Sequence, residues 1–261
     1  MKQRNNVQII DVKTDVEIAA MREVSRMTAK ILCHLAAMVK VDMSADVIDD
    51  EAKRLIAGYA GAQAAFFGYR GFPYSICVSR NEEVVHGFPV KNKVFRDGDL
   101  VSLDFGVRYK GYYGDAATTV ALGDVKPQDK KLMEVTRRSL ELAIEKVKPG
   151  ATVGDLGSAV FTHVKDNGMD VVREFVGHGI GRSLHEDPAV PNWGSPGKGA
   201  KLIEGMTLAI EPMVAAGNGD VVIASDGWTA RTKDKSMAAH FEHTVLVTDK
   251  GCEILTVIEE K

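Results

Sequence analysis

The spacing of hydrophobic residues alternates along the chain between that of helices and that of strands. A capping box of Thr14 and Glu17 precedes apolar residues that recur at helical spacing up to Met38. We expect a long helix there. Three more helices are expected over residues 44–60 (capped by Ser44), 128–147 and 153–166. Between and after these helices, strand spacing appears in LVSLDFGV, YYGDAATTVAL, MTLAIEPMV, DVVIAS and FEHTVLVT. This order predicts an α+β fold rather than a regular alternation of strand, helix and strand.

Two stretches of the chain resemble each other and each carries acids. When DGDLVSLDF is laid on EGMTLAIEP, Asp104 meets Glu211. A second acid follows in each half, Asp115 in GDAATTV and Glu242 in FEHTVLV, and each leads into a strand rich in Thr and Val. We therefore expect two related halves that supply two carboxylates each. Chance similarity between acids that flank strands remains the alternative at this point.

The acids are expected to gather in apolar surroundings. If the Lys-Gly dipeptide between two predicted strands forms a two-residue turn, Asp104 faces Ala117, which shares a face of the sheet with Asp115. Two close carboxylates among apolar neighbours require a proton or a cation between them. Glu211 and Glu242 are embedded in apolar runs in the same way. Solvated surface positions do not explain such a pattern.

The four acids and one histidine from GHGIG form an oxygen-rich ligand set with a single nitrogen. Such a set can hold two divalent ions that share carboxylates, and it suits Mn, Co or Fe(II), with Zn also allowed. It argues against a purely structural zinc site. Paired metals hold a bridging water as hydroxide and polarise the carbonyl group that it attacks. The pattern therefore predicts a hydrolase.

Composition and charge exclude several other classes. With 261 residues, of which 45% are apolar and 26% charged, the chain is ordinary for a globular protein. A net charge of −3 and a pI near 6.2 give no broad basic surface, so no nucleic acid partner is expected. The start, MKQRNNVQIIDVKTD, lacks the apolar core of a signal peptide, and no run is long enough to span a membrane. We expect a cytoplasmic protein.

Other catalytic and binding motifs are missing from the chain. Neither GxSxG nor HExxH occurs, which removes the common serine-hydrolase and single-zinc classes. GHGIG does not fit the GxGxxG pattern of dinucleotide binding, because its third glycine comes one residue too early. The three cysteines are scattered without CxxC spacing, so neither a disulfide framework nor a thiolate zinc site is expected.

Six motifs, in their order and spacing, resemble the type I methionine aminopeptidases of the pita-bread fold. They are VVHGFP, SLDFG, GYYGDAATT, GHGIGRSLHEDP, AIEPMV and FEHTVLVT. The resemblance extends over about residues 15–255. It implies two pseudosymmetric halves, in which an antiparallel sheet is flanked by helix pairs, and this agrees with the internal match. We expect one catalytic domain over residues 1–261, with halves of about 15–125 and 126–255 and no N-terminal extension domain.

The resemblance also implies a ligand set for two divalent ions: Asp104, Asp115, His178, Glu211 and Glu242. Asp115 and Glu242 would bridge both ions, and Glu211 would also carry a proton. His185 would bond to the scissile carbonyl oxygen, and His86 would contact the peptide near the leaving nitrogen. The implied lining of the substrate pocket is His86, Tyr69, Phe72, Cys77, Leu184 and Trp228.

Two features of these motifs affect the geometry of the site. His178 and His185 lie seven positions apart and would point to opposite faces of a regular strand, so they converge only if Gly179 and Gly181 break it. The chain also departs from the commonest family pattern: Phe66, Val85 and Leu184 stand where a cysteine, a cysteine and a phenylalanine are more frequent. These departures affect the expected shape of the pocket and leave the metal ligands intact.

The implied activity is metal-dependent removal of the initiator methionine from nascent proteins and peptides whose second residue is small. Proline-specific and creatinase-like enzymes of this fold carry a large N-terminal domain, for which there is no room before the first helix. Type II methionine aminopeptidases insert a subdomain between the last two acidic ligands, whereas Glu211 and Glu242 are only 31 positions apart. A binding module of the same fold without activity remains the alternative. The metal in the cell and any transient ribosome contact stay open, and a monomer is the default expectation.

Overall fold

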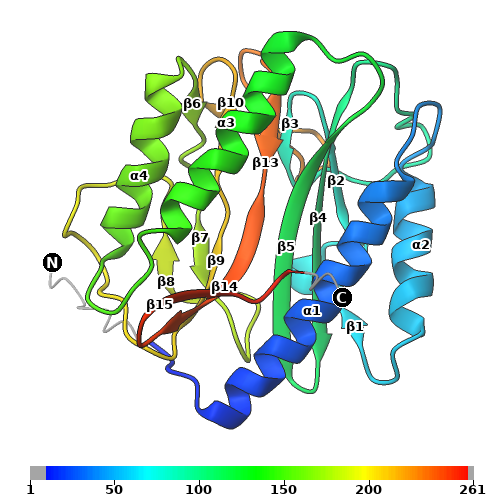
Figure 1. The fold of residues 1–261 in the computed structure, drawn as a ribbon. Helices are drawn as coiled ribbons and strands as arrows, with labels where there is room; N and C mark the ends of the chain where they lie inside the picture. Colours follow the sequence, from blue (N-terminus) through cyan, green and yellow to red (C-terminus); the bar gives the residue numbers. More distant parts are fainter. Residues whose placement is uncertain (1–9, 258–261) are drawn as a thin grey trace, which may run out of the picture.

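A large antiparallel sheet lies at the centre of the molecule, with helices packed across one face (Figure 1). The structure is a computed structural model that describes residues 10–257, so the expectation about the chain's start falls partly outside the described residues. The helices are α1 (Asp15–Met38), α2 (Asp46–Ala57), α3 (Pro127–Ile144) and α4 (Val153–Asp166), with the short 3-10 helix η1 (Tyr69–Gly71). No helix within residues 10–257 is both long and apolar enough to cross a membrane.

The main sheet runs in the order β1-β4-β5-β14-β9-β7-β8, and β2 and β15 pair with β4 and β14. Its strands are β1 (Gln63–Ala64), β2 (Cys77–Arg80), β4 (Leu100–Tyr109), β5 (Tyr112–Ala121), β7 (Gly177–Gly179), β8 (Glu186–Val190), β9 (Thr207–Ile210), β14 (Glu242–Thr248) and β15 (Gly251–Ile254). Two smaller sheets have the orders β13-β10-β6 and β11-β12-β3. Their strands are β3 (Glu83–Val85), β6 (Asp170–Val171), β10 (Met213–Ala215), β11 (Val221–Ile223), β12 (Ala230–Thr232) and β13 (Ala238–His240).

The predicted helices are present, and their ends follow from local hydrogen bonds. The Glu17 carboxylate accepts the backbone N–H of Thr14 at 2.9 Å and its hydroxyl at 2.8 Å, which confirms the capping box of α1. The bounds of α4 agree with the predicted 153–166. The second helix begins later than predicted, at Asp46. Ser44 does not cap it: the N-cap position is Ala45, which has no side-chain cap hydrogen bond, and the backbone of Ser44 pairs with Val94 in an isolated bridge.

The hairpin of β4 and β5 has the predicted register. Lys110 and Gly111 form the turn with φ values of 50° and 85°, the left-handed conformation that a two-residue hairpin turn requires. Asp104 consequently pairs with Ala117. The strand predicted over MTLAIEPMV is wrong as a single element, because it is interrupted at Glu211 and Pro212. Proline has no N–H for the ladder, and the two parts, β9 and β10, belong to different sheets.

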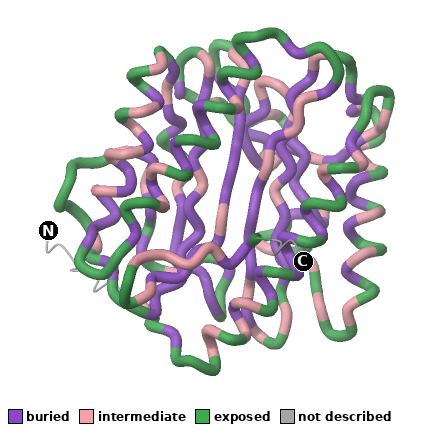
Figure 2. Tube along the Cα trace, viewed as in Figure 1, coloured by how far each residue is buried: buried purple, intermediate pink, exposed green. Residues whose placement is uncertain are grey.

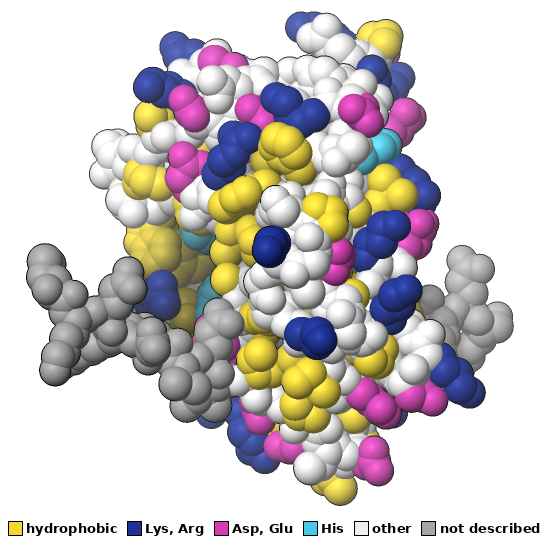
Figure 3. Space-filling view, turned by 90° about the vertical axis from the view of Figure 1, so that its left-hand side faces the viewer, with side chains coloured by type: hydrophobic (Ala, Val, Ile, Leu, Met, Phe, Trp, Pro, Cys, Tyr) yellow, Lys and Arg dark blue, Asp and Glu magenta, His cyan; other side chains and the backbone are white. Residues whose placement is uncertain are grey.

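Each helix pair covers its own hydrophobic cluster. One cluster joins α1 and α2 to β4, and the other joins α3 and α4 to β9 and β14. The central strands are buried along their length, whereas the helices alternate between buried and exposed positions (Figure 2). On the face shown in Figure 3, basic and acidic side chains are interspersed and form no broad basic patch. The packing agrees with the predicted flanking helix pairs, and the division into two related halves stays a prediction.

Candidate metal centre and substrate pocket

Neighbouring strands bring three of the predicted carboxylates onto one face of the main sheet. Ala117 of β5 pairs with Asp104 of β4 on one side and with Glu242 of β14 on the other. Asp115 lies two residues from Ala117 along β5 and therefore points to the same face. Asp104, Ala117 and Glu242 thus form a row across three strands, and the small methyl group of Ala117 leaves space between the two carboxylates.

The opposite face of β5 is the one that packs against the helices. A Cβ atom on Gly114 would lie 2.9 Å from the Cα atom of Ser25 in α1, so α1 approaches the backbone closely at this glycine. Asp115 is the next residue and points away from α1. The candidate metal centre therefore lies on the face of the sheet that the helices leave uncovered.

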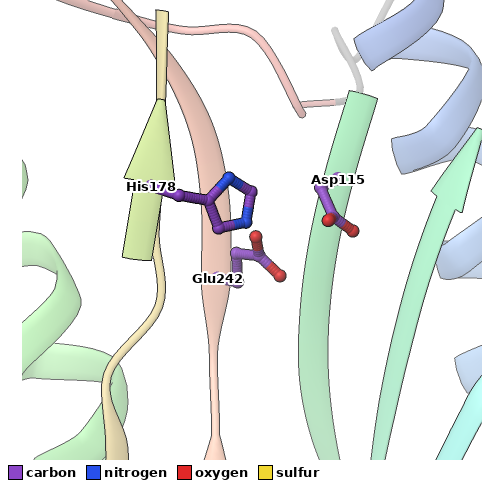
Figure 4. Close-up of side chains that lie close together, drawn as sticks. All are labelled: Asp115, His178 and Glu242. Carbon is purple, nitrogen blue, oxygen red and sulfur yellow. The ribbon is translucent and has the colours of Figure 1, made fainter. Parts of the chain in front are cut away.

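The remaining two predicted ligands, His178 and Glu211, come from β7 and from the end of β9. Ile210 pairs with His243, which places Glu211 next in line beside Glu242. His178 pairs with Ala209 on the other edge of β9. Donor atoms of Asp115, His178 and Glu242 all lie within 4.8 Å of one another (Figure 4). The sequence prediction that these residues converge from distant parts of the chain agrees with this geometry.

Burial gives the acidic groups unusual proton affinities. It raises the pKa of Glu211 to about 8 and that of Asp104 to about 7. In Asp115 and Glu242, burial and then the neighbouring carboxylates raise the pKa well above its ordinary value. Without a counter-charge, such a cluster holds protons at neutral pH. A bound cation would take their place.

Unpaired carboxylate oxygens test whether the residues fit a metal. Asp104 Oδ1, Asp115 Oδ1 and Glu242 Oε1 are buried without a hydrogen-bond partner among residues 10–257. Buried polar atoms are rarely left in this state, because an unmet hydrogen bond costs free energy. Divalent cations bind carboxylate oxygens, so the residues present fit the implied metals.

His178 is in the protonation state that metal binding requires. Its Nδ1 lies 2.8 Å from the carbonyl oxygen of Gly179, which can only accept, so Nδ1 carries the proton and Nε2 keeps a free lone pair. Metal-binding histidines commonly have this arrangement. Burial, followed by the nearby charge of His185, lowers the pKa of His178 to about 3 and keeps the ring neutral.

A single small cavity collects the predicted site residues. Its volume is about 130 Å³, smaller than the ~300 Å³ or more of pockets that hold drug-sized ligands. The cavity is lined by the predicted Tyr69, Phe72, Cys77, His86, Asp104, Asp115, His178, Leu184, His185, Glu211, Trp228 and Glu242, together with Phe66 and Arg70. Its size suits one amino-acid side chain.

Aromatic and sulfur groups form the apolar wall of this cavity. The rings of Phe72 and Trp228 meet edge to face, with their centroids 5.2 Å apart. Cys77 pairs with Asp104 across β2 and β4, so its sulfur lies beside a predicted metal ligand. Burial raises the pKa of the Cys77 thiol well above its usual range and keeps it neutral. The wall therefore offers polarisable apolar contacts.

Two further histidines reach the cavity from loops. The His185 ring stacks on Tyr69 with centroids 5.2 Å apart and lies 4.2 Å from the His178 ring. His86 has a φ of 59°, an uncommon conformation for a residue with a side chain, of the kind that clusters at functional sites. Burial lowers the pKa of both His86 and His185 to about 4, so both rings are neutral and can donate one hydrogen bond.

The glycines of GHGIG act mainly through close approach. β7 ends at Gly179, and its pairing with β8 shifts in register there, as the predicted strand break requires. A Cβ on Gly179 would lie 2.2 Å from the carbonyl oxygen of Asp187, and one on Gly181 would lie 2.5 Å from Lys13 Cε. Neither glycine has a positive φ. They allow the loop after His178 to fold back tightly.

The sequence did not indicate two residues of the site. Arg70 lines the cavity and lies over the Tyr69 ring, at 5.4 Å from its centroid. His240 is buried with its Nε2 3.5 Å from Glu211 Oε2. The signal in the sequence that could have indicated His240 is its position two residues before the predicted ligand Glu242. The intervening break between β13 and β14 made strand alternation an unsafe guide.

Comparisons with known proteins agree with this geometry. The family model of metallopeptidase family M24 matches residues 19–249. The chain is 45% identical to methionine aminopeptidase 1 of Bacillus subtilis (strain 168), over 95% of this chain and 99% of that protein. It is 41% identical to the methionine aminopeptidase of Escherichia coli (strain K12), over 95% and 94% of the two chains. The solved methionine aminopeptidase of Thermotoga maritima matches with a TM-score of 0.94 at 46% identity, covering 96% of this chain and 100% of that one.

Proposed function

The chain belongs to metallopeptidase family M24, and we propose that it removes the N-terminal methionine of peptides with the help of two divalent metal ions. One observation carries the proposal: buried carboxylate oxygens without hydrogen-bond partners converge beside a small apolar cavity. The names of the relatives, which are similar over nearly the whole chain, support methionine as the residue removed. The proposed product pair is free methionine and the shortened peptide.

We propose that five side chains hold the ions: Asp104, Asp115, His178, Glu211 and Glu242. Asp115 and Glu242 lie in the middle of the row of strands and are suited to be shared by both ions. The oxygen-rich set favours Mn, Co or Fe(II), and Zn is also allowed. When bound, the ions would lower the pKa of a water molecule and polarise the scissile carbonyl group.

The chain's own groups would then orient the peptide and move protons. The Glu211 carboxylate is the proposed proton carrier, which takes a proton from the attacking water and returns it to the leaving amine nitrogen. A ring N–H of His185 would donate to the scissile carbonyl oxygen as negative charge develops there. His86, held by its constrained backbone, would contact the peptide near the leaving nitrogen.

The apolar wall would bind the methionine side chain. A thioether is flexible and polarisable, and aromatic rings and sulfur are its favourable neighbours. Phe72, Trp228 and Cys77 offer such contacts, and Tyr69 and Leu184 complete the wall. Phe66 also lines it, so two of the three departures from the common family pattern, Phe66 and Leu184, lie in the cavity wall, whereas Val85 is not among the lining residues.

Metal dependence is the first test of the proposal. The purified protein, stripped with a chelator, is expected to release no methionine from Met-Ala-Ser, and Mn, Co, Fe(II) or Zn is expected to restore release. The ions supply the charge that the cluster of acids requires. A chelated protein that keeps full activity would contradict the proposed metal dependence, and a protein that is inert with all four metals would favour a binding module.

Selectivity for the second residue of the substrate is a further prediction. Met-Ala-Ser is expected to exceed Met-Lys-Ser and Met-Trp-Ser in kcat/KM by about a hundredfold or more, because a bulky second side chain would clash with His86 and the metals near the mouth of the cavity. Met-Gly-Ser is the control and should be cleaved comparably to Met-Ala-Ser. Equal kcat/KM values for alanine and tryptophan peptides would contradict the proposed orientation of the substrate.

We also propose that the enzyme works in the cytoplasm as a monomer on nascent chains, and that any contact with ribosomes is transient. Initiator methionine is exposed as chains emerge from ribosomes, which supports this setting. The acidic pI near 6.2 supports the absence of a nucleic acid partner. Sedimentation of the purified protein alone would test its oligomeric state, and sedimentation with ribosomes would test the contact. We expect the protein to move to the ribosomal fraction only at low salt.

A further inference from the structure

A buried ion pair anchors the loop that carries His185 to the segment ahead of α1. Lys13 Nζ lies 2.6 Å from Glu186 Oε2, and the two side chains are only 2% and 13% exposed. The other oxygen, Glu186 Oε1, accepts the backbone N–H of Ser183 at 2.9 Å. Glu186 thus closes the short loop around Leu184 and His185 and ties it to a residue 173 positions away.

The surrounding backbone is shaped to hold this pair. A Cβ on Gly181 would lie 2.5 Å from Lys13 Cε and 2.9 Å from Glu186 Oε1, so any side chain at this position would displace both partners. The backbone N–H of Lys13 donates to the carbonyl oxygen of Gly205 at 2.9 Å, which fixes the segment that carries the ammonium group. The ammonium group is therefore held on its own side of the pair by a segment that is bonded to the backbone of Gly205.

His185 has no comparable anchor of its own. Among the described residues 10–257, no hydrogen bond to its ring is present, and its ring contacts are with Tyr69 and His178. Stacking on Tyr69 restrains the tilt of the imidazole but leaves it able to slide within its plane. The position of the His185 ring nitrogens in the cavity therefore depends on what holds the backbone of the loop around Leu184 and His185.

We propose that Lys13 and Glu186 are positioning residues for catalysis, which hold His185 where its N–H can meet the scissile carbonyl oxygen. This inference rests on the role proposed for His185. A donor that acts on charge developing in the transition state affects kcat more than substrate binding. A shift of about 1 Å in such a group can cost about a hundredfold in rate.

The single variants Lys13→Met and Glu186→Gln test the anchor. Each is expected to lower kcat for Met-Ala-Ser by about tenfold or more, with KM changed by less than about threefold. Lys13→Arg, which keeps a cation, should recover most of the loss. Arg182→Gln is the matched control. Arg182 lies on the same loop as His185 and forms an ion pair with Glu17 of α1, but its side chain is 61% exposed, so this ion pair is not buried. The kcat of Arg182→Gln is expected to stay within about threefold of the wild type.

A double variant separates positioning from stability. Lys13→Met combined with Glu186→Met replaces the buried charges by an apolar pair, which commonly restores stability. The Tm is expected to recover while kcat stays low, because the Ser183 N–H has lost its acceptor. Recovery of kcat together with Tm, or single variants with wild-type kcat, would overturn the inference if His185→Ala still lowers kcat by about a hundredfold or more. A wild type that is inert, or a fully active His185→Ala variant, would instead overturn the proposed function or the role of His185.

Discussion

Asp115→Asn is expected to abolish release of methionine from Met-Ala-Ser and to weaken metal binding. The loss of metal affinity should exceed ~10–100-fold, which is the usual cost of mutating a residue that contacts a metal ligand and not the metal itself. Asparagine offers one neutral oxygen in place of a negative carboxylate, and Asp115 is one of the three residues whose donor atoms lie within 4.8 Å of one another. Calorimetric titration with Mn and an assay of released methionine would measure both effects.

The same substitution should act in the opposite direction on the metal-free protein. Burial and neighbouring carboxylates make the ionised form of Asp115 unfavourable without a cation. Folding of the stripped wild type at neutral pH requires this carboxyl group to take up a proton, a cost that the neutral asparagine does not have, so the Tm of the stripped variant is expected to exceed that of the stripped wild type by about 2–4 °C. Asp124→Asn, at an exposed aspartate just after β5, is the control and should change neither quantity. Full activity and unchanged metal affinity in Asp115→Asn would contradict the proposed ligand set.

His185→Ala is expected to lower kcat for Met-Ala-Ser by about 10²–10³-fold, the usual cost of removing one donor to a developing oxyanion. Its KM and metal affinity should change little, because the ring donates in the transition state and is not one of the proposed ligands. Steady-state kinetics with saturating metal, and metal titration of the same preparation, would measure the three quantities.

An exposed histidine provides the control for this prediction. His34 lies in α1, its side chain is 52% exposed and it pairs with Glu51. His34→Ala should keep wild-type kcat. A His185→Ala variant with unchanged kcat would refute the proposed donor, and one that loses its metals would show that His185 acts as a ligand instead.

Local signals in the sequence account for much of the fold. The Lys110-Gly111 turn fixes the register of its hairpin, and with it the pairing of Asp104 with Ala117, because a two-residue turn allows one alignment. Thr152 and Asn167 mark the ends of α4 for similar local reasons. The start of the helix at Asp46 was predicted less well, since the backbone of Ser44 pairs with Val94 in a distant part of the sequence. A tertiary contact of that kind leaves no trace in local spacing.

The candidate site likewise contains residues that the sequence predicted and contacts that it did not predict. The motifs were sufficient to predict which side chains would line one cavity, and all of those side chains do so. They did not predict His240 beside Glu211, because that contact depends on a change of sheet between β13 and β14. Nor did they predict the Lys13–Glu186 pair, whose partners are 173 positions apart. Pro212, within the run predicted as one strand, was a local signal that should have divided it.

Anomalous diffraction from crystals grown with excess Mn would test the central claim most directly, because it locates the ions independently of activity. We predict two anomalous peaks inside the cavity, contacted by Asp104, Asp115, His178, Glu211 and Glu242. Peaks only elsewhere, or a cavity in which these five side chains contact solvent alone at saturating Mn, would contradict the account.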